Sequence, residues 1–222
     1  MKARAVVFDF YGLLLETEGP AYQAWTEIYR DHGHELPSER WLDYIGREGS
    51  WFDALGHLGA LVGAGFDRDA VRARREARKT ELIEVLDLMP GVRERVAEAK
   101  ARGMKVGVAS SSTVRWVGGH LDRLAFREVF DAVTCREDGI RAKPAPDLYV
   151  ASVLSLGVEP EEAIAIEDSA NGIAAAKAAG LRCVAVPNEL TAQQDLSAAD
   201  LRLGSLAEMP LSDILARLGF EP

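Results

Sequence analysis

Cysteine and histidine are scarce in this chain, and it contains no long hydrophobic run. The 222 residues include two cysteines and four histidines. Cys135 and Cys183 lie in separate apolar runs without a Cys-x-x-Cys or Cys/His spacing, so two buried free thiols are favoured over a disulfide or a zinc site. The apolar run that follows Met1 stops at Asp9, which is too short for a secretion signal or a membrane span. We therefore expect a cytoplasmic protein.

Positive charge is also in short supply. The chain has 26 Lys and Arg against 35 Asp and Glu, a formal net charge of −9. This balance argues against nucleic acid or a membrane surface as the main partner. With 48% hydrophobic and 27% charged residues, the composition is that of an ordinary folded protein. We expect a small-molecule partner and a monomer or weak dimer.

The hydrophobic pattern divides the chain into two parts. Apolar runs without alternation are typical of strands buried on both faces, and they occur at residues 3–8, 105–109, 132–135, 163–166 and 182–186. After residue 88 these runs alternate with helical stretches, which predicts an α/β fold with a doubly wound, Rossmann-like parallel sheet. Residues 17–86 are helical throughout, and glycines divide them into about four helices, the first with Thr17 as its N-cap. We assign residues 1–15 and 88–222 to the core and 16–87 to an inserted helical-bundle cap.

Polar residues collect where the predicted core strands end. The residues in question are Asp9, Ser110, Lys143, Glu167 and Asp168. Because the carboxyl ends of parallel strands meet at one edge of a sheet, we expect these side chains to form one site. Carboxylates without nearby histidine or cysteine suit Mg²⁺, while a lysine and a hydroxyl can hold a phosphate. The pattern therefore favours phosphoryl transfer, in which one carboxylate attacks phosphorus.

These segments resemble the four motifs of the haloacid dehalogenase-like (HAD) hydrolase superfamily. The four motif segments are residues 7–18, 108–112, 143–147 and 166–172. They stand in the family's order and span most of the chain. The helical segment after the first motif resembles the cap of the subgroup of sugar-phosphate phosphatases and β-phosphoglucomutase. The resemblance implies a HAD-like fold and Mg²⁺-dependent hydrolysis of small phosphate esters through an aspartyl-phosphate.

The resemblance also implies a role for each site residue. Asp9 would be the nucleophile and a metal ligand. The metal site would be completed by the backbone carbonyl of Tyr11 and the carboxylates of Glu167 and Asp168. The transferring phosphoryl group would be held by Ser110, Ser111 and Lys143. In the cap, Arg47 and Lys79 are candidate substrate contacts, although most of the basic run at 72–79 is expected to face solvent.

Tyr11 departs from the family pattern. Phosphatases and mutases of the family carry an aspartate there, which protonates the leaving group and later activates water. A tyrosine, with an ordinary pKa near 10, is a poor base at neutral pH, so we expect impaired turnover. The residue before Thr17, Glu16, is expected to act in the hinge or in helix capping.

Two alternative functions stay open because of Tyr11. Tyrosine occupies this place in the metal-independent 2-haloacid dehalogenases, and a degenerate member could bind a phosphorylated ligand with little turnover. The pair Glu167 and Asp168 favours phosphate chemistry, since two carboxylates facing Asp9 without a cation would repel each other and a carboxylate substrate.

Overall fold

A parallel sheet of six strands forms the centre of the molecule. The computed structural model describes residues 1–44, 52–137 and 139–221, and the strand order within them is β3-β2-β1-β4-β5-β6. The strands are β1 (Ala5–Phe8), β2 (Lys105–Ser110), β3 (Ala132–Cys135), β4 (Ala163–Glu167), β5 (Arg182–Ala185) and β6 (Leu201–Arg202). All neighbouring pairs are parallel. The doubly wound, Rossmann-like sheet is thus confirmed.

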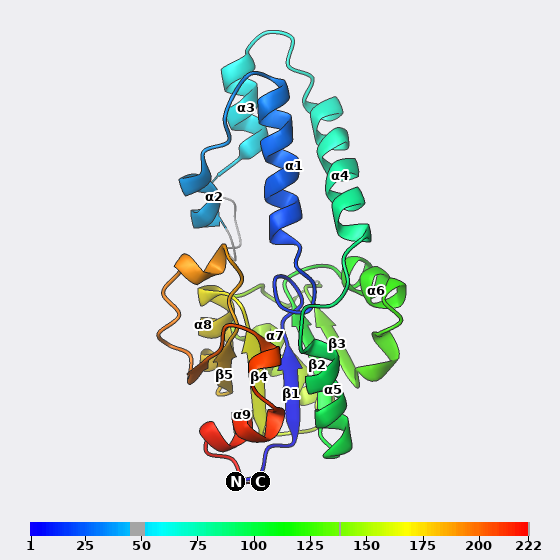
Figure 1. Ribbon diagram of the computed structural model, residues 1–222, viewed down its shortest axis with the longest axis vertical. Coiled ribbons are helices and arrows are strands. Elements are labelled where there is room, and N and C mark those ends of the chain that lie inside the picture. The colour runs from blue at the N-terminus through cyan, green and yellow to red at the C-terminus, as the bar shows by residue number, and fades with distance from the viewer. Residues whose placement is uncertain (45–51, 138, 222) are drawn as a thin grey trace.

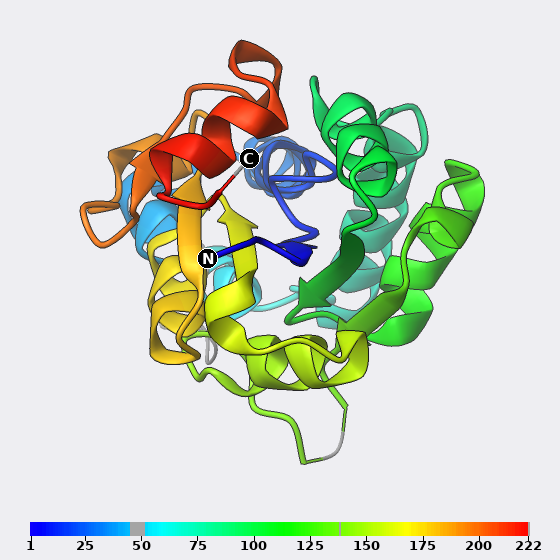
Figure 2. The same cartoon turned by 90° about the horizontal axis from the view of Figure 1, so that it is seen from below.

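Helices cover both faces of the sheet, which explains why the strands are apolar without alternation. Val6 and Phe8 of β1 face a core shared with α5 (Val92–Ala101), α6 (Val114–Arg123) and α9 (Leu211–Arg217). Ala5 and Val7 face the opposite core, which α7 (Asp147–Leu156) and α8 (Ala170–Ala178) close. Figure 2, which looks up from the end of the molecule that holds both termini, shows the strands between these helices. Every residue of β1 is completely buried.

In the described part of the chain, four further helices stand beyond the carboxyl ends of the strands (Figure 1), and we call them the cap helices. They are α1 (Glu18–Asp31), α2 (Ser38–Tyr44), α3 (Ala54–Val62) and α4 (Arg68–Glu84). Their buried side chains, including Trp25, Tyr29 and Leu58, form a hydrophobic cluster separate from the two cores of the sheet. The exact boundaries of core and cap, at residues 15/16 and 87/88, stay a prediction.

The first cap helix is not capped as the sequence suggested. Thr17 occupies the N-cap position, but its buried hydroxyl makes no capping hydrogen bond. Instead, Glu16 Oε1 accepts hydrogen bonds at 3.1 Å from the backbone N–H groups of both Glu18 and Gly19. The longer glutamate side chain reaches the free N–H groups that the threonine does not reach. A capping role for Glu16 agrees with the prediction.

The C-terminal part of the chain adds elements that the hydrophobic pattern did not predict. The two-residue strand β6 extends the sheet beside β5, and α9 packs on the face covered by α5. The end of the chain returns to its start, where the Met1 amino group and Glu221 Oε1 lie 2.6 Å apart. Across the described residues, every helix is too short or too polar to cross a membrane.

Candidate active site

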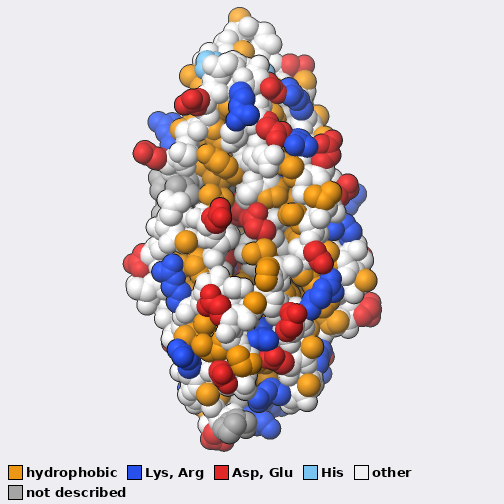
Figure 3. Space-filling model, in the orientation of Figure 1, with side chains coloured by type: hydrophobic (Ala, Val, Ile, Leu, Met, Phe, Trp, Pro, Cys, Tyr) orange, Lys and Arg blue, Asp and Glu red, His pale blue; other side chains and the backbone are white. Residues whose placement is uncertain are grey.

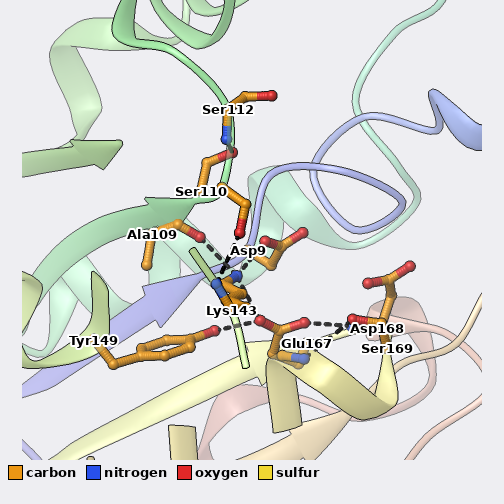
Figure 4. A network of polar contacts seen from close by, with 11 residues as sticks. Asp9, Ala109, Ser110, Ser112, Lys143, Tyr149, Glu167, Asp168 and Ser169 are labelled. Carbon is orange, nitrogen blue, oxygen red and sulfur yellow. Dashed lines mark hydrogen bonds and ion pairs between the residues drawn. The ribbon is translucent and has the colours of Figure 1, made fainter. Parts of the chain in front are cut away.

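The polar residues that follow the strands converge at one point (Figure 4). Asp9 directly follows β1, Ser110 ends β2 and Glu167 ends β4. Lys143 comes from the loop between β3 and α7 and is only 6% exposed. The predicted convergence therefore takes place, because β1 pairs with β2 on one side and with β4 on the other.

The Lys143 ammonium group is the centre of the polar network. It donates hydrogen bonds to Asp9 Oδ1, to Glu167 Oε1 at 2.6 Å and to the Ala109 carbonyl oxygen at 2.8 Å. These three acceptors use all three ammonium protons. The position of the ammonium group is therefore fixed from three sides. Its two carboxylate partners come from the ends of the paired strands β1 and β4.

Burial and charge act against each other in this network. Burial raises the pKa of Asp9 to about 7, although the Lys143 charge opposes the shift and the Glu167 charge adds to it. Burial alone would lower the pKa of Lys143, but the carboxylates of Asp9 and Glu167 outweigh it, so that the pKa is raised. The lysine is therefore charged at any physiological pH, whereas Asp9 needs further positive charge to stay ionised.

A cation held by three buried carboxylates would provide this positive charge. Oxygen atoms of Asp9, Glu167 and Asp168 lie within 4.8 Å of one another. Burial and the charges of Asp9 and Glu167 raise the pKa of Asp168 well above its usual value. No described lysine or arginine forms an ion pair with Asp168, and its arrangement with two further carboxylates is the donor set that hard divalent cations prefer.

Two residues that the sequence analysis did not single out hold these carboxylates. The Asn188 side chain donates to Asp168 Oδ2 at 3.0 Å, and its own oxygen accepts from the backbone N–H groups of Leu190 and Thr191. The Tyr149 hydroxyl donates to Glu167 Oε1 at 2.7 Å. Both residues lie outside the four motifs, so that only their position in the fold reveals them.

Two glycines make room for the same carboxylates. At Gly12, where φ is +70°, a Cβ atom would come within 2.3 Å of Asp168 Oδ2. At Gly172, a Cβ atom would lie 1.9 Å from Glu167 Oε2. Any larger residue at either position would displace an acidic side chain of the site.

The two serines occupy different places. Ser110 is completely buried beside Asp9 and Lys143, and its hydroxyl oxygen accepts from the Ser112 N–H at 3.2 Å. The Ser111 hydroxyl oxygen accepts from the backbone N–H of Lys143 at 3.2 Å, which ties the second motif to the third. A phosphate-binding role stays a prediction for both residues.

Tyr11 is partly buried and packed against the core. Burial raises the pKa of its phenol further above the ordinary value, as do the charges of Glu18, Asp9 and Glu76, while Ser112 acts in the opposite direction. The phenol therefore stays protonated at neutral pH and cannot serve as a base.

The cap residues divide by helix face. Arg72, Arg74 and Arg78 point outward and pair with carboxylates at the surface of the cap. Arg75 and Lys79, one turn apart, have side chains only 17% exposed. The Lys79 ammonium lies 2.8 Å from Glu76 and 4.6 Å from the ring centroid of Trp116 in the core. Most of the basic run is thus a solvated face, as expected.

Two residues of the cap are predicted to contact substrate. Lys79 lies where cap and core meet, and its contact with substrate stays a prediction. Arg47 falls outside the described residues.

Comparisons with known proteins agree with this geometry. A family model of haloacid dehalogenase-like hydrolases matches residues 3–180. The Bacillus subtilis (strain 168) protein YhcW is 38% identical over 97% of both chains. Hexitol phosphatase B of Escherichia coli (strain K12) is 34% identical over 95% of this chain and 96% of its own.

A solved structure extends the likeness to the whole fold. It is a mutant of CbbY from Rhodobacter sphaeroides in complex with xylulose-1,5-bisphosphate, 29% identical, with a TM-score of 0.72. The alignment covers 95% of this chain and 98% of that chain. The matching family model, the motifs at the strand ends and the fold together show that this chain belongs to the haloacid dehalogenase-like hydrolases.

Proposed function

We propose that this hydrolase cleaves small phosphate monoesters, of the sugar-phosphate type, through an aspartyl-phosphate on Asp9. The observation that carries the proposal is the buried contact of Asp9 with Lys143, next to two further carboxylates. Lys143 binds Oδ1 of Asp9, so that the second oxygen, Oδ2, can face a substrate. Such a site suits a substrate that carries negative charge on oxygen and needs an anionic nucleophile.

The donor set fits Mg²⁺. Asp9, Glu167, Asp168 and the backbone carbonyl of Tyr11 would hold the ion, since all are oxygen donors and the three carboxylates lie close together. A bound Mg²⁺ offsets the negative charge of the phosphoryl oxygens and of the carboxylates. The pKa shift of Asp168 supports this assignment, because burial among like charges raises its pKa and a bound cation would oppose that shift.

Each residue of the site then has a definite task. Asp9 attacks phosphorus as the ester bond to the leaving group breaks. Ser110 donates a hydrogen bond to the transferring phosphoryl oxygens, and Lys143 does so by giving up one of its three present acceptors, while its ion pair keeps Asp9 in place. The cap helices stand over the strand ends and can exclude water from the site.

Tyr11→Asp is the variant that tests the phosphatase proposal. It would introduce a carboxylate that can exchange protons, so kcat for a hexitol phosphate is expected to rise. The measurement is phosphate release from a panel of esters, and chloride release from 2-chloropropionate, with and without Mg²⁺. The wild type and the Asp168→Asn variant are assayed alongside.

The same assay separates the competing functions. Chloride release that needs no metal and survives Asp168→Asn would assign a dehalogenase instead. Saturable phosphate binding without any ester turnover, in both the wild type and Tyr11→Asp, would assign a binding protein. Mg²⁺-dependent phosphate release that increases in Tyr11→Asp supports the proposal.

Asn188→Ala is expected to weaken Mg²⁺ binding by about 10–100-fold, the usual effect of removing a group that orients a metal ligand. The amide of Asn188 is the hydrogen-bond donor that fixes Asp168 Oδ2. The measurement is the Mg²⁺ concentration for half-maximal activity, with Gln23→Ala, an exposed amide on α1, as the control. An unchanged Mg²⁺ requirement in Asn188→Ala would contradict this positioning role.

A further inference from the structure

The proposed reaction needs a proton carrier that Tyr11 does not provide. The leaving group must gain a proton when the ester bond breaks, and the attacking water must lose one. The raised pKa of the Tyr11 phenol excludes it as the base. A group that performs both steps must lie beside Asp9, face the cap, and be free of fixed partners.

Glu18 meets these requirements by its place in the fold. It is the first residue of α1 and enters the cap directly after the loop that carries Asp9 and Tyr11. Its side chain is partly buried, and its carboxylate makes no hydrogen bond or ion pair with any residue of the described ranges. The neighbouring Glu16, by contrast, uses its carboxylate to cap α1.

The groups around Glu18 come from both the core and the cap. Negative charge faces it from Asp9 and Asp168 in the core, with Tyr11 also close enough to interact, and from Glu16 at the start of α1. Positive charge faces it from Arg75 and Lys79 on α4, but both are already paired with Glu76. Figure 3 shows acidic side chains near the middle of the visible face, where the cap meets the core.

These surroundings determine how readily Glu18 exchanges a proton. Burial raises the pKa of Glu18 to about 7, with further contributions from Glu16 and Asp9, while Arg75 and Lys79 act in the opposite direction. An acid with this pKa can both donate and accept a proton near neutral pH. Its neighbours on the sheet are less suitable, because Asp9 and Asp168 are assigned to the nucleophile and the cation.

We propose that Glu18, on the first turn of the cap, carries the proton in the reaction of this chain. This inference rests on the proposed phosphatase function. In the first step, the protonated Glu18 carboxyl gives its proton to the ester oxygen as the P–O bond to the leaving group breaks and Asp9 bonds to phosphorus. In the second step, the Glu18 carboxylate takes a proton from water as the water oxygen bonds to phosphorus and the bond to Asp9 breaks. Inorganic phosphate leaves, and Glu18 is protonated again.

The test is a double-mutant cycle between Glu18→Gln and Tyr11→Asp. Glutamine keeps the size and polarity of the side chain but cannot exchange a proton. We measure kcat at saturating Mg²⁺ for sorbitol 6-phosphate, a poor leaving group, and for p-nitrophenyl phosphate, a good one, across the pH range around 7. Glu16→Gln is the matched control, because it alters a neighbouring carboxylate that serves as a helix cap.

The cycle distinguishes proton transfer from a structural or binding role. In the wild-type background, Glu18→Gln is expected to lower kcat for sorbitol 6-phosphate by ~10²-fold or more, the size of one acid–base contribution. With Tyr11→Asp in place, the introduced aspartate carries the proton and the loss is expected to fall below about threefold. For p-nitrophenyl phosphate, the initial burst of p-nitrophenol persists in Glu18→Gln while steady turnover slows, and the pH dependence near 7 disappears.

Two results would overturn the role of Glu18 alone. One is an equal loss from Glu18→Gln in both backgrounds, which indicates a structural or substrate-binding role. The other is a Glu18→Gln activity within about twofold of the Glu16→Gln control. A wild type that releases no phosphate from either ester would instead overturn the proposed function together with this inference.

Discussion

Asp9→Asn is expected to abolish phosphate-ester turnover while the protein stays folded. The amide is not a nucleophile, so kcat should fall by at least about 10⁴-fold, as it does when other covalent nucleophiles are removed. Asp9 is only 6% exposed and is paired with Lys143, so no other carboxylate can take its place without displacing a neighbour. The measurement is single-turnover phosphate release, with the protein mass after acid quenching as a check for a phosphoryl adduct.

The stability of Asp9→Asn provides the control and has a definite pH dependence. The folded pKa of Asp9 is raised to about 7 from an unfolded value of 3.8, mainly by burial. The folded state therefore binds more protons than the unfolded state between these values, and the stability of the wild type falls as the pH rises. Metal-free Asp9→Asn lacks the carboxyl group that binds this proton. Its free energy of unfolding relative to wild type should therefore increase from pH 4 to pH 8. A variant that is unfolded at pH 8, or that keeps measurable turnover, would contradict the assignment.

Lys143→Met is expected to remove both activity and stability. At pH 8 it leaves Asp9, Glu167 and Asp168 buried without a positive partner, and breaking a buried ion pair in this way costs about 3–5 kcal/mol of unfolding free energy. The loss of a donor to the phosphoryl group should lower kcat by about 10²-fold or more. Urea unfolding and ester hydrolysis measure the two effects separately.

A second lysine-to-methionine variant, Lys105→Met, tests whether the loss of stability is specific to the site. Lys105→Met removes an exposed lysine whose ion pair with Asp131, at 3.3 Å, lies at the surface, and should change stability by no more than about 0.5 kcal/mol. The deficit of Lys143→Met should shrink at pH 5, where the carboxylates can bind protons, and on addition of Mg²⁺, which binds only the folded state. Equal stabilities of the two variants would show that Lys143 is not the balancing charge.

Much of the core was determined by local sequence. The apolar run at 163–166 became β4 almost residue for residue, because a strand buried on both faces needs continuous apolar side chains. The polar residues of the site were predictable for a related reason. Parallel strands end at one edge, so Asp9 and Ser110 had to meet once β1 and β2 paired.

Other features had no local signal. The two residues of β6 are too few for a hydrophobic pattern, and their strand exists only because β5 offers a free edge. Thr17 and Glu16 could each cap α1 by residue type, and the choice depends on which side chain reaches the free N–H groups.

The functional site shows the same division. The sequence by itself determined the residue types of the site, and Asp9, Lys143 and Asp168 are the types that the proposed phosphoryl transfer over a hard cation would require. Only the tertiary structure decided how the charges balance. It placed Lys143 between two carboxylates, left Asp168 with Asn188, and brought Glu18 of the cap within range of the Asp9 charge. Proton affinities depend on burial and on the distances between charges, and those arise only when segments far apart in the chain are packed together.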